Sequence, residues 1–95
     1  MNKDSISLAL KNALNKVQKL SGEEPVSIGD NTIPIGELPG FDSLRAIEAI
    51  VELSKELDTE LQDDINIFIS KKENRALNIN EITNLIYEHI RKEEK

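Results

Sequence analysis

The sequence has 95 residues with a net charge of −6, one histidine and no cysteine, and its length suits a single domain over residues 1–95. The lack of cysteine excludes disulfides, thiolate metal sites and a cysteine nucleophile, and the single histidine argues against a histidine-built metal site and an ordinary enzyme. No stretch approaches the ~18 apolar residues of a membrane span, and the N-terminus lacks an apolar signal-peptide core. We therefore expect a cytoplasmic protein without membrane insertion.

The charge is unevenly distributed along the chain. Residues 1–22 carry +3, residues 23–64 carry −10 and residues 65–95 carry +1. The acidic middle part would repel phosphates, so the charge pattern argues against nucleic-acid binding. A protein partner with a basic surface is the natural complement of this part of the chain.

Residues 4–20 show the spacing of an amphipathic helix. Six apolar residues fall on one stripe of this helix: Ile6, Leu10, Ala13, Leu14, Val17 and Leu20. Asp4 or Ser5 can cap its start, and Ser21-Gly22 favours its end.

The connection over residues 23–40 contains all three prolines of the chain. Two pairs of alternating apolar residues flank a turn signal at residues 29–31: Val26 and Ile28, then Ile33 and Ile35. This alternation predicts either a short extended pair or an irregular loop packed by its isoleucines.

Residues 43–57 predict a second helix that is apolar around most of its circumference. At ~100° per residue, its charged side chains share one arc of about 100°. These side chains are Arg45, Glu48, Glu52, Lys55 and Glu56. We expect neighbours to bury the other sides, which would make this the central helix of a bundle with the charged arc facing solvent.

Two segments complete the chain. Residues 65–76 have β-branched character and candidate caps at Asp63 and Asp64, and we favour a short helix or irregular crossing because a lone strand would lack a partner. Residues 79–92 predict a last helix that starts at a capping box of Asn78 and Glu81. The predicted fold class is therefore all-α, a four-helix bundle with a long loop between the first two helices.

Asp42 and Ser43 stand at the start of the second helix, directly after the turn formers at 39–40. Both residue types favour helix starts, so simple capping is one interpretation. The other is that Ser43 is exposed for chemistry done by another protein, since a helix N-terminus favours a phosphate attached there. Ser43 has no base of its own, because the single histidine, His89, falls on the apolar stripe of the last helix. We expect no catalytic and no metal-binding residues.

The stretches GFDSL, residues 40–44, and RAIEAIVELSKELDTEL, residues 45–61, resemble the acyl carrier proteins, whose hallmark is Asp-Ser-Leu at the start of the second helix. The resemblance runs without a gap over these residues. It extends more weakly, in the same helix order, to the first and last helices, and so covers essentially the whole chain. It implies a four-helix acyl-carrier-type bundle with a long first loop.

The resemblance also implies that Ser43 carries 4′-phosphopantetheine as a phosphodiester, attached from coenzyme A by a phosphopantetheinyl transferase. The terminal thiol of this arm would hold acyl groups as thioesters for fatty-acid, lipid or secondary-metabolite biosynthesis. Gly40, Asp42 and Leu44 match the attachment motif, and by the same resemblance Asp42 helps the transferase site to bind metal.

The resemblance further implies a docking face for acyl-transferring or condensing enzymes with basic surfaces. We assign four residues to this face: Arg45, Glu48, Glu52 and Glu56. Its acidic residues favour fast and salt-sensitive encounters. We expect the carrier to be a monomer, and its Ile/Leu interior to be either an ordinary core or one that opens to shelter an acyl chain.

Several features depart from the fatty-acid-synthesis carriers. Arg45 and Lys55 interrupt a face that is more uniformly acidic there, and the connections over 23–40 and 62–77 are longer than usual. We therefore expect a specialised carrier, with an amino-acyl or peptidyl carrier left open. The alternative from another class is a helical interaction module that docks through its acidic face and carries no prosthetic group.

Overall fold

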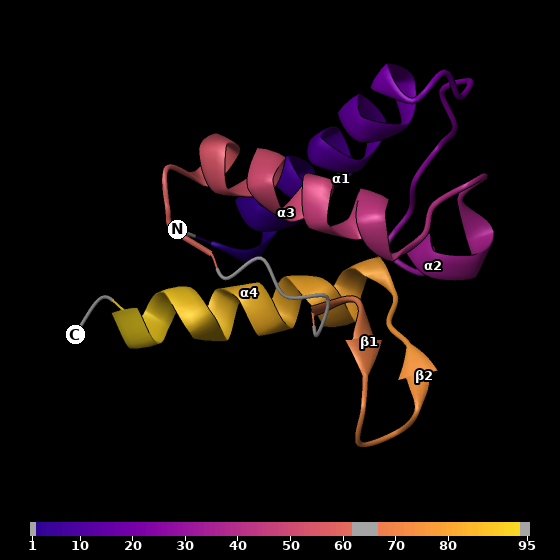
Figure 1. The fold of residues 1–95 in the computed structure, drawn as a ribbon. Helices are drawn as coiled ribbons and strands as arrows, with labels where there is room; N and C mark the ends of the chain where they lie inside the picture. The colour runs from indigo at the N-terminus through magenta and orange to yellow at the C-terminus, as the bar shows by residue number, and fades with distance from the viewer. Residues whose placement is uncertain (1, 62–66, 94–95) are drawn as a thin grey trace.

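We describe residues 2–61 and 67–93 of the protein from a computed structural model. This part of the chain is mostly helical, as predicted, and contains one short two-stranded sheet (Figure 1). The elements are α1 (Lys3–Leu20), α2 (Pro34–Glu37), α3 (Ser43–Leu57), β1 (Ile69–Ser70), β2 (Arg75–Ala76) and α4 (Ile79–Glu93).

Helix α1 begins at Lys3 because Asn2 caps it: the Asn2 Oδ1 atom accepts a hydrogen bond from the Ser5 backbone nitrogen at 2.8 Å. The predicted caps at Asp4 or Ser5 were therefore wrong by two to three residues. One face of α1 is buried and comprises Ile6, Ala9, Leu10, Ala13, Leu14, Val17 and Gln18. Leu20, which we predicted on this stripe, is exposed.

The connection over residues 23–40 forms no extended pair and is irregular apart from the single turn of α2, so the alternative of a mostly irregular loop was correct. Its turn instead lies against the start of α4. The carbonyl oxygens of Asp30 and Thr32 accept hydrogen bonds from the backbone nitrogens of Asn80 at 3.0 Å and Ile79 at 2.9 Å. Because these nitrogens belong to the first turn of a helix, they have no partner within the helix. The loop therefore satisfies the start of α4.

Helix α3 has the predicted bounds, but it is not the central helix. Helix α1 packs against both α3 and α4, whereas α3 and α4 make few direct contacts with each other, so α1 is the helix that the other two share. Leu44 and Val51 on α3 are exposed by 65% and 43%, whereas we predicted neighbours around most of this helix. Helix α2 is a single turn in which Ile35 and Gly36 have non-helical backbone angles, so the described residues contain three long helices and one short turn.

The prediction of a short helix or irregular crossing over residues 65–76 was wrong for its described part. Strands β1 and β2 pair antiparallel, with Ile69 opposite Ala76 and Ser70 opposite Arg75. The strand does find a partner, because a tight turn through Asn74, whose φ is 54°, brings the chain back on itself. The candidate caps at Asp63 and Asp64 lie outside the described residues. The hairpin projects beyond α4, away from α1 and α3 (Figure 1).

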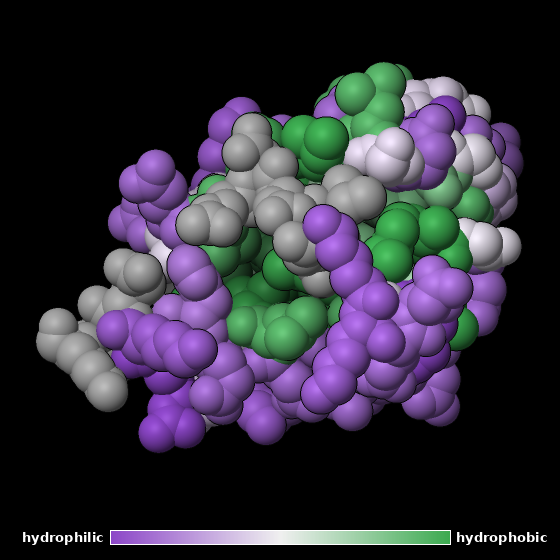
Figure 2. All heavy atoms as spheres, turned by 60° about the horizontal axis from the view of Figure 1, so that its bottom comes forward, coloured by the Kyte–Doolittle hydropathy of each residue, from purple (hydrophilic) through white to green (hydrophobic). Residues whose placement is uncertain are grey.

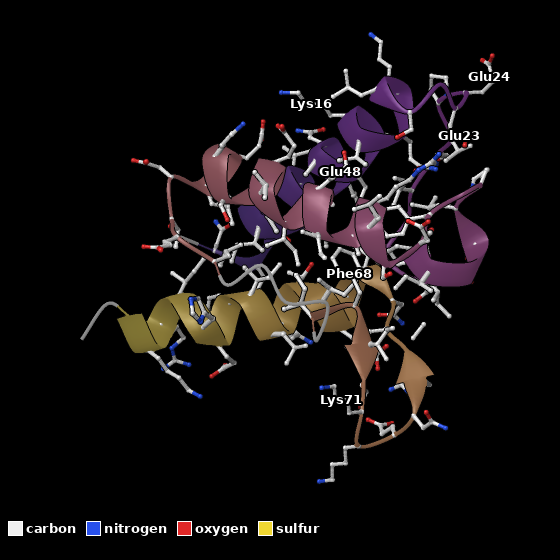
Figure 3. All side chains as sticks on the ribbon, in the orientation of Figure 1. Lys16, Glu23, Glu24, Glu48, Phe68 and Lys71 are labelled. Atoms are coloured by element: carbon white, nitrogen blue, oxygen red, sulfur yellow. The ribbon has the colours of Figure 1, made fainter. Side chains whose placement is uncertain are left out.

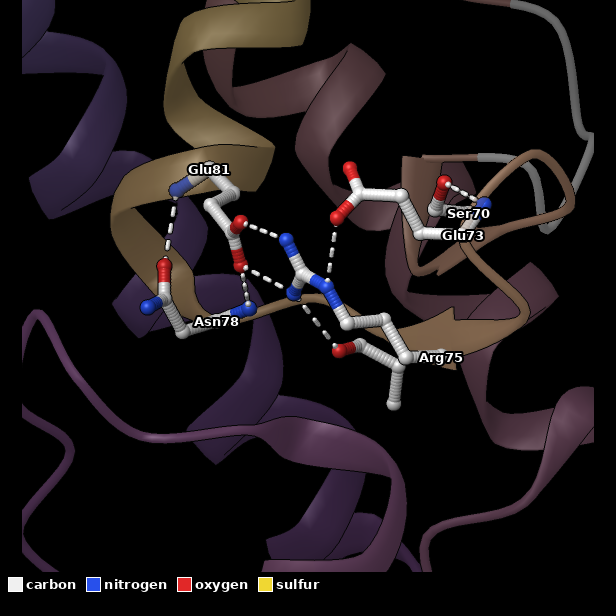
Figure 4. A network of polar contacts seen from close by, with 6 residues as sticks. Ser70, Glu73, Arg75, Asn78 and Glu81 are labelled. Atoms are coloured by element: carbon white, nitrogen blue, oxygen red, sulfur yellow. Dashed lines mark hydrogen bonds and ion pairs between the residues drawn. The ribbon is translucent and has the colours of Figure 1, made fainter.

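The predicted capping box at the start of α4 is confirmed. The Glu81 backbone nitrogen donates to Asn78 Oδ1 at 2.9 Å, and the Asn78 backbone nitrogen donates to Glu81 Oε1 at 3.0 Å. Arg75 of β2 adds its guanidinium group, which donates to both carboxylate oxygens of Glu81 and also to Glu73 (Figure 4). The hairpin is thereby attached to the first turn of α4.

Two aromatic rings connect the hairpin segment to the segment that leads into α3. Phe41 and Phe68 are 5% and 1% exposed, and their ring centroids lie 5.6 Å apart at an interplanar angle of 50°. A tilted pair at this distance is favourable beyond the apolar area that it buries. The core therefore continues from the helices to the residue two positions before Ser43.

Candidate functional site

The start of α3 exposes Ser43 behind a formed cap. Asp42 has an extended backbone; its Oδ1 atom accepts from the Arg45 backbone nitrogen at 3.0 Å, and its carbonyl oxygen accepts from the Ala46 nitrogen at 2.9 Å. Ser43 is the first helical residue, and both it and Leu44 are exposed. The capping interpretation therefore holds for Asp42, and it leaves Ser43 accessible at the positive end of the helix dipole.

Gly40 is required by the conformation of this segment. Its φ of +66° lies in the left-handed region, and a Cβ atom built there would lie 2.7 Å from Nη1 of Arg45 and 2.8 Å from Oε2 of Glu23. Any other residue would be strained and would displace these two groups. In the motif Gly-Phe-Asp-Ser-Leu, Gly40 therefore allows the backbone to lie close to the Arg45 and Glu23 side chains. Asp42 then caps α3, and Ser43 follows as an exposed residue.

The four residues assigned to a docking face differ in their surroundings. Glu48 and Glu56 are exposed. The side chain of Arg45 is 20% exposed and forms an ion pair with Glu23 at 3.0 Å. The side chain of Glu52 is 17% exposed and lies 3.0 Å from Nζ of Lys16 on α1. The predicted arc of solvent-facing charges was therefore wrong for these two side chains, which are largely covered; Figure 3 shows Glu48 on α3.

Sequence reasoning missed two residues of this region, Gln18 and Glu23. Gln18 is 2% exposed, its Nε2 atom donates to the Pro39 carbonyl oxygen at 2.7 Å, and its Oε1 atom accepts from Arg45 at 3.1 Å. Helical spacing could have indicated it, because Gln18 follows Leu14 by four positions and so falls on the apolar stripe of α1. The position of Glu23 in an irregular loop carries no comparable signal.

A second surface feature lies between the hairpin and α4. Figure 2 shows hydrophobic residues exposed among hydrophilic ones on this side of the molecule. An open groove of about 470 Å³ is lined by Ile69, Ser70, Lys71, Lys72, Glu73, Leu77, Glu81, Asn84 and Leu85. Leu85 of α4 is 44% exposed there. The groove contains none of the residues of the Gly40–Leu44 motif.

His89 is half-buried on α4, and in residues 2–61 and 67–93 no cluster of three or more His, Asp or Glu side chains is placed to hold a metal ion. In the same residues, no helix is both long and apolar enough to cross a membrane.

Comparison of the chain with protein-family models, with curated proteins and with solved structures gives no match.

Proposed function

We propose that this protein is an acyl carrier protein, with Ser43 as the attachment point of 4′-phosphopantetheine. The observation that carries the proposal is the exposed Ser43 at the first position of α3, between the cap Asp42 and the exposed Leu44. The order of the long helices α1, α3 and α4, with a long connection after the first, is compatible with a four-helix carrier-type bundle.

The residues at the start of α3 fit a phosphodiester on Ser43. The hydroxyl is on an exposed residue, and the free backbone nitrogens of a first helical turn favour a negative group. The Asp42 carboxylate is occupied by the cap and leaves the serine side chain unblocked. When bound, the group would supply a thiol that holds acyl chains as thioesters.

The residues around this site would then act in binding and orientation. Exposed Glu48 and Glu56 favour the approach of enzymes with basic surfaces, among them the transferase and acyl-transferring or condensing enzymes. Exposed Leu44 and Val51 offer apolar contact beside these charges. We propose a monomeric, cytoplasmic, specialised carrier that performs no catalysis itself.

The proposal is tested by incubating the protein with coenzyme A and a broad-specificity phosphopantetheinyl transferase, and by measuring intact mass. We expect one added phosphopantetheine on the wild type and none on Ser43→Ala. The chain contains a matched control, because Asp4-Ser5-Ile6 also places an exposed serine after an aspartate in a first helical turn. Ser5→Ala should be modified like the wild type.

The second candidate is an interaction module without a prosthetic group, which the amphipathic surface of Leu44, Glu48 and Val51 also favours. Such a module would dock through this surface regardless of Ser43. If the wild type stays unmodified with several transferases, this result would contradict the proposal of an acyl carrier protein and favour the interaction module.

A further inference from the structure

The Arg45 side chain joins three segments that meet below the Gly40 turn. Its Nη1 atom donates to Glu23 Oε2 at 3.0 Å, to Gln18 Oε1 at 3.1 Å and to the Pro39 carbonyl oxygen at 3.1 Å. These acceptors belong to the connection after α1, to the last turns of α1 and to the loop before α3. We name this arrangement of Arg45, Glu23, Gln18 and Pro39 the Arg45 cluster.

The cluster is partly shielded from solvent and closely packed. Gln18 is 2% exposed, and the side chains of Arg45 and Glu23 are 20% and 27% exposed. The Pro39 carbonyl oxygen also accepts from Gln18 Nε2, at 2.7 Å. Because Gly40 has no side chain, its backbone can lie directly against the guanidinium group, where a Cβ atom would clash. Charged hydrogen bonds that are partly removed from water are stronger and less screened than surface pairs.

We propose that Arg45 is a positioning residue for Ser43: it holds the turn at residues 39–41 against α1 and so fixes where α3 presents the serine. This inference rests on the proposed function. Two hydrogen bonds of Arg45 hold the segment that contains Ser43. The Arg45 side chain donates to the Pro39 carbonyl oxygen, four residues before Ser43, and the Arg45 backbone nitrogen donates to Asp42, directly before Ser43. The positive charge of Arg45 is largely covered and forms an ion pair with Glu23, so a basic partner that approaches α3 contacts the exposed Glu48 and not this cation.

The alternative role of Arg45, direct contact with a partner, predicts the opposite change in the rate of modification when Arg45 is replaced. An exposed cation on a face that docks basic surfaces would slow encounter, so removing it should accelerate modification. A positioning residue predicts slower modification of Arg45→Met, which keeps the apolar stem and loses the donors. Arg45→Lys should restore part of the rate, since an ammonium retains a charged donor without the planar guanidinium geometry.

The first measurement is amide hydrogen exchange of the unmodified protein, which does not depend on its function. The Phe41 amide donates to the Leu38 carbonyl oxygen at 3.1 Å, and the amide of residue 45 donates to Asp42. We expect Arg45→Met to accelerate exchange of both by about tenfold or more, as local opening becomes easier. Ile86→Val is the control, because Ile86 is 1% exposed on α4 and lies outside the Arg45 cluster, so the change weakens the core elsewhere. In this variant, the exchange of the two amides relative to the other amides of the protein should match that of the wild type.

The second measurement is the steady-state rate of phosphopantetheine transfer at a temperature where all variants are folded. If the competent conformation falls to a tenth of the population, KM should rise about tenfold with little change in kcat, and Ile86→Val should match the wild type. A wild type that accepts no group overturns the proposed function and this role for Arg45 together. A modified wild type with Arg45→Met equal or faster, and unchanged amide exchange, overturns the positioning role while the carrier function stands.

Discussion

The carboxylate of Glu52 on α3 lies 3.0 Å from the ammonium group of Lys16 on α1 and 3.7 Å from that of Lys55. The hydrogen bond from Lys16 is the main reason why the pKa of Glu52 lies below its ordinary value. The charge of Glu52 is therefore compensated within the protein, whereas Glu48, one turn earlier, is exposed. These two acidic residues, one turn apart on the same helix, thus differ in how accessible their carboxylates are to a basic side chain of a partner.

We expect Glu48→Gln to reduce kcat/KM for phosphopantetheine transfer by about two- to fivefold at low salt, because one exposed charge contributes roughly 1 kcal/mol to a close ion pair in water. Glu52→Gln should reduce it less, since Lys16 and Lys55 already neutralise that position. Transfer rates at ~0.05 M and ~0.5 M salt test this, because added salt should remove the difference.

Glu24→Gln is the matched control for charge loss away from α3, since Glu24 is exposed in the connection after α1 (Figure 3). Its transfer rate should stay near that of the wild type. Equal effects of the changes at Glu24 and Glu48 would indicate a response to net charge and would contradict a docking face on α3.

The cap of α3 makes a separate prediction about stability. Asp42→Ala should lower the free energy of unfolding by about 1 kcal/mol, the usual cost of losing an N-cap. For a domain of this size, that loss corresponds to a Tm decrease of roughly 4–8 °C. Asp42→Asn keeps an oxygen that can accept from the Arg45 nitrogen and should retain most of the stability. Thermal unfolding followed by circular dichroism measures both, and equal Tm values for Asp42→Ala and the wild type would show that the cap contributes nothing.

The link between the hairpin and α4 predicts a dependence of stability on pH. The Arg75 guanidinium, helped by the Asn78 backbone nitrogen, lowers the pKa of Glu81 from 4.5 to about 2. A carboxyl group whose pKa is depressed by folding stabilises the folded state above its unfolded pKa, and this contribution is lost as the pH falls through the folded pKa. Stability should therefore decline as the pH falls from about 4.5 toward 2.

Urea unfolding at several pH values in this window measures the decline. Glu81→Gln should show a shallower pH slope than the wild type, because it keeps the capping oxygen and loses the titrating group. Arg75→Met should flatten the slope similarly. Parallel slopes for Glu81→Gln and the wild type would contradict the assignment of this pH dependence to Glu81.

The contact between Phe41 and Phe68 predicts that the hairpin segment supports the start of α3. Phe68→Ala should cost about 3–5 kcal/mol, as expected for a buried aromatic side chain. Phe68→Leu keeps an apolar side chain at this position and should cost less. Chemical denaturation compares the two, and a loss under 1 kcal/mol for Phe68→Ala would show that this ring is not part of the core.

Periodicity and capping chemistry predict the three long helices well, because both act over a few neighbouring residues. The bounds of α3 and the Asn78–Glu81 capping box follow from such local signals. The start of α1 was misplaced because Asn2, Asp4 and Ser5 all favour helix starts, and choosing among them needs the backbone geometry.

Contacts between distant segments account for the remaining differences. The alternating apolar residues of the connection over 23–40 left an extended pair and an irregular loop equally open. The choice depends on a distant contact, because the turn at 29–32 accepts hydrogen bonds from the backbone nitrogens at the start of α4. The sequence places Arg45 on a charged arc, yet Gln18 and Glu23 draw its side chain inward. The exposure of Ser43 follows from the local motif, whereas the cluster that supports it depends on the tertiary fold.

The most direct test of the central claim uses the absence of cysteine from this chain. A maleimide reagent has no thiol to label in the unmodified protein, so any thiol gained by transfer from coenzyme A belongs to the added group. After treatment with coenzyme A and a phosphopantetheinyl transferase, we predict one maleimide per wild-type chain, located on the peptide that contains Ser43, and none on Ser43→Ala. A wild type that gains no thiol, or label that persists in Ser43→Ala, would contradict the account.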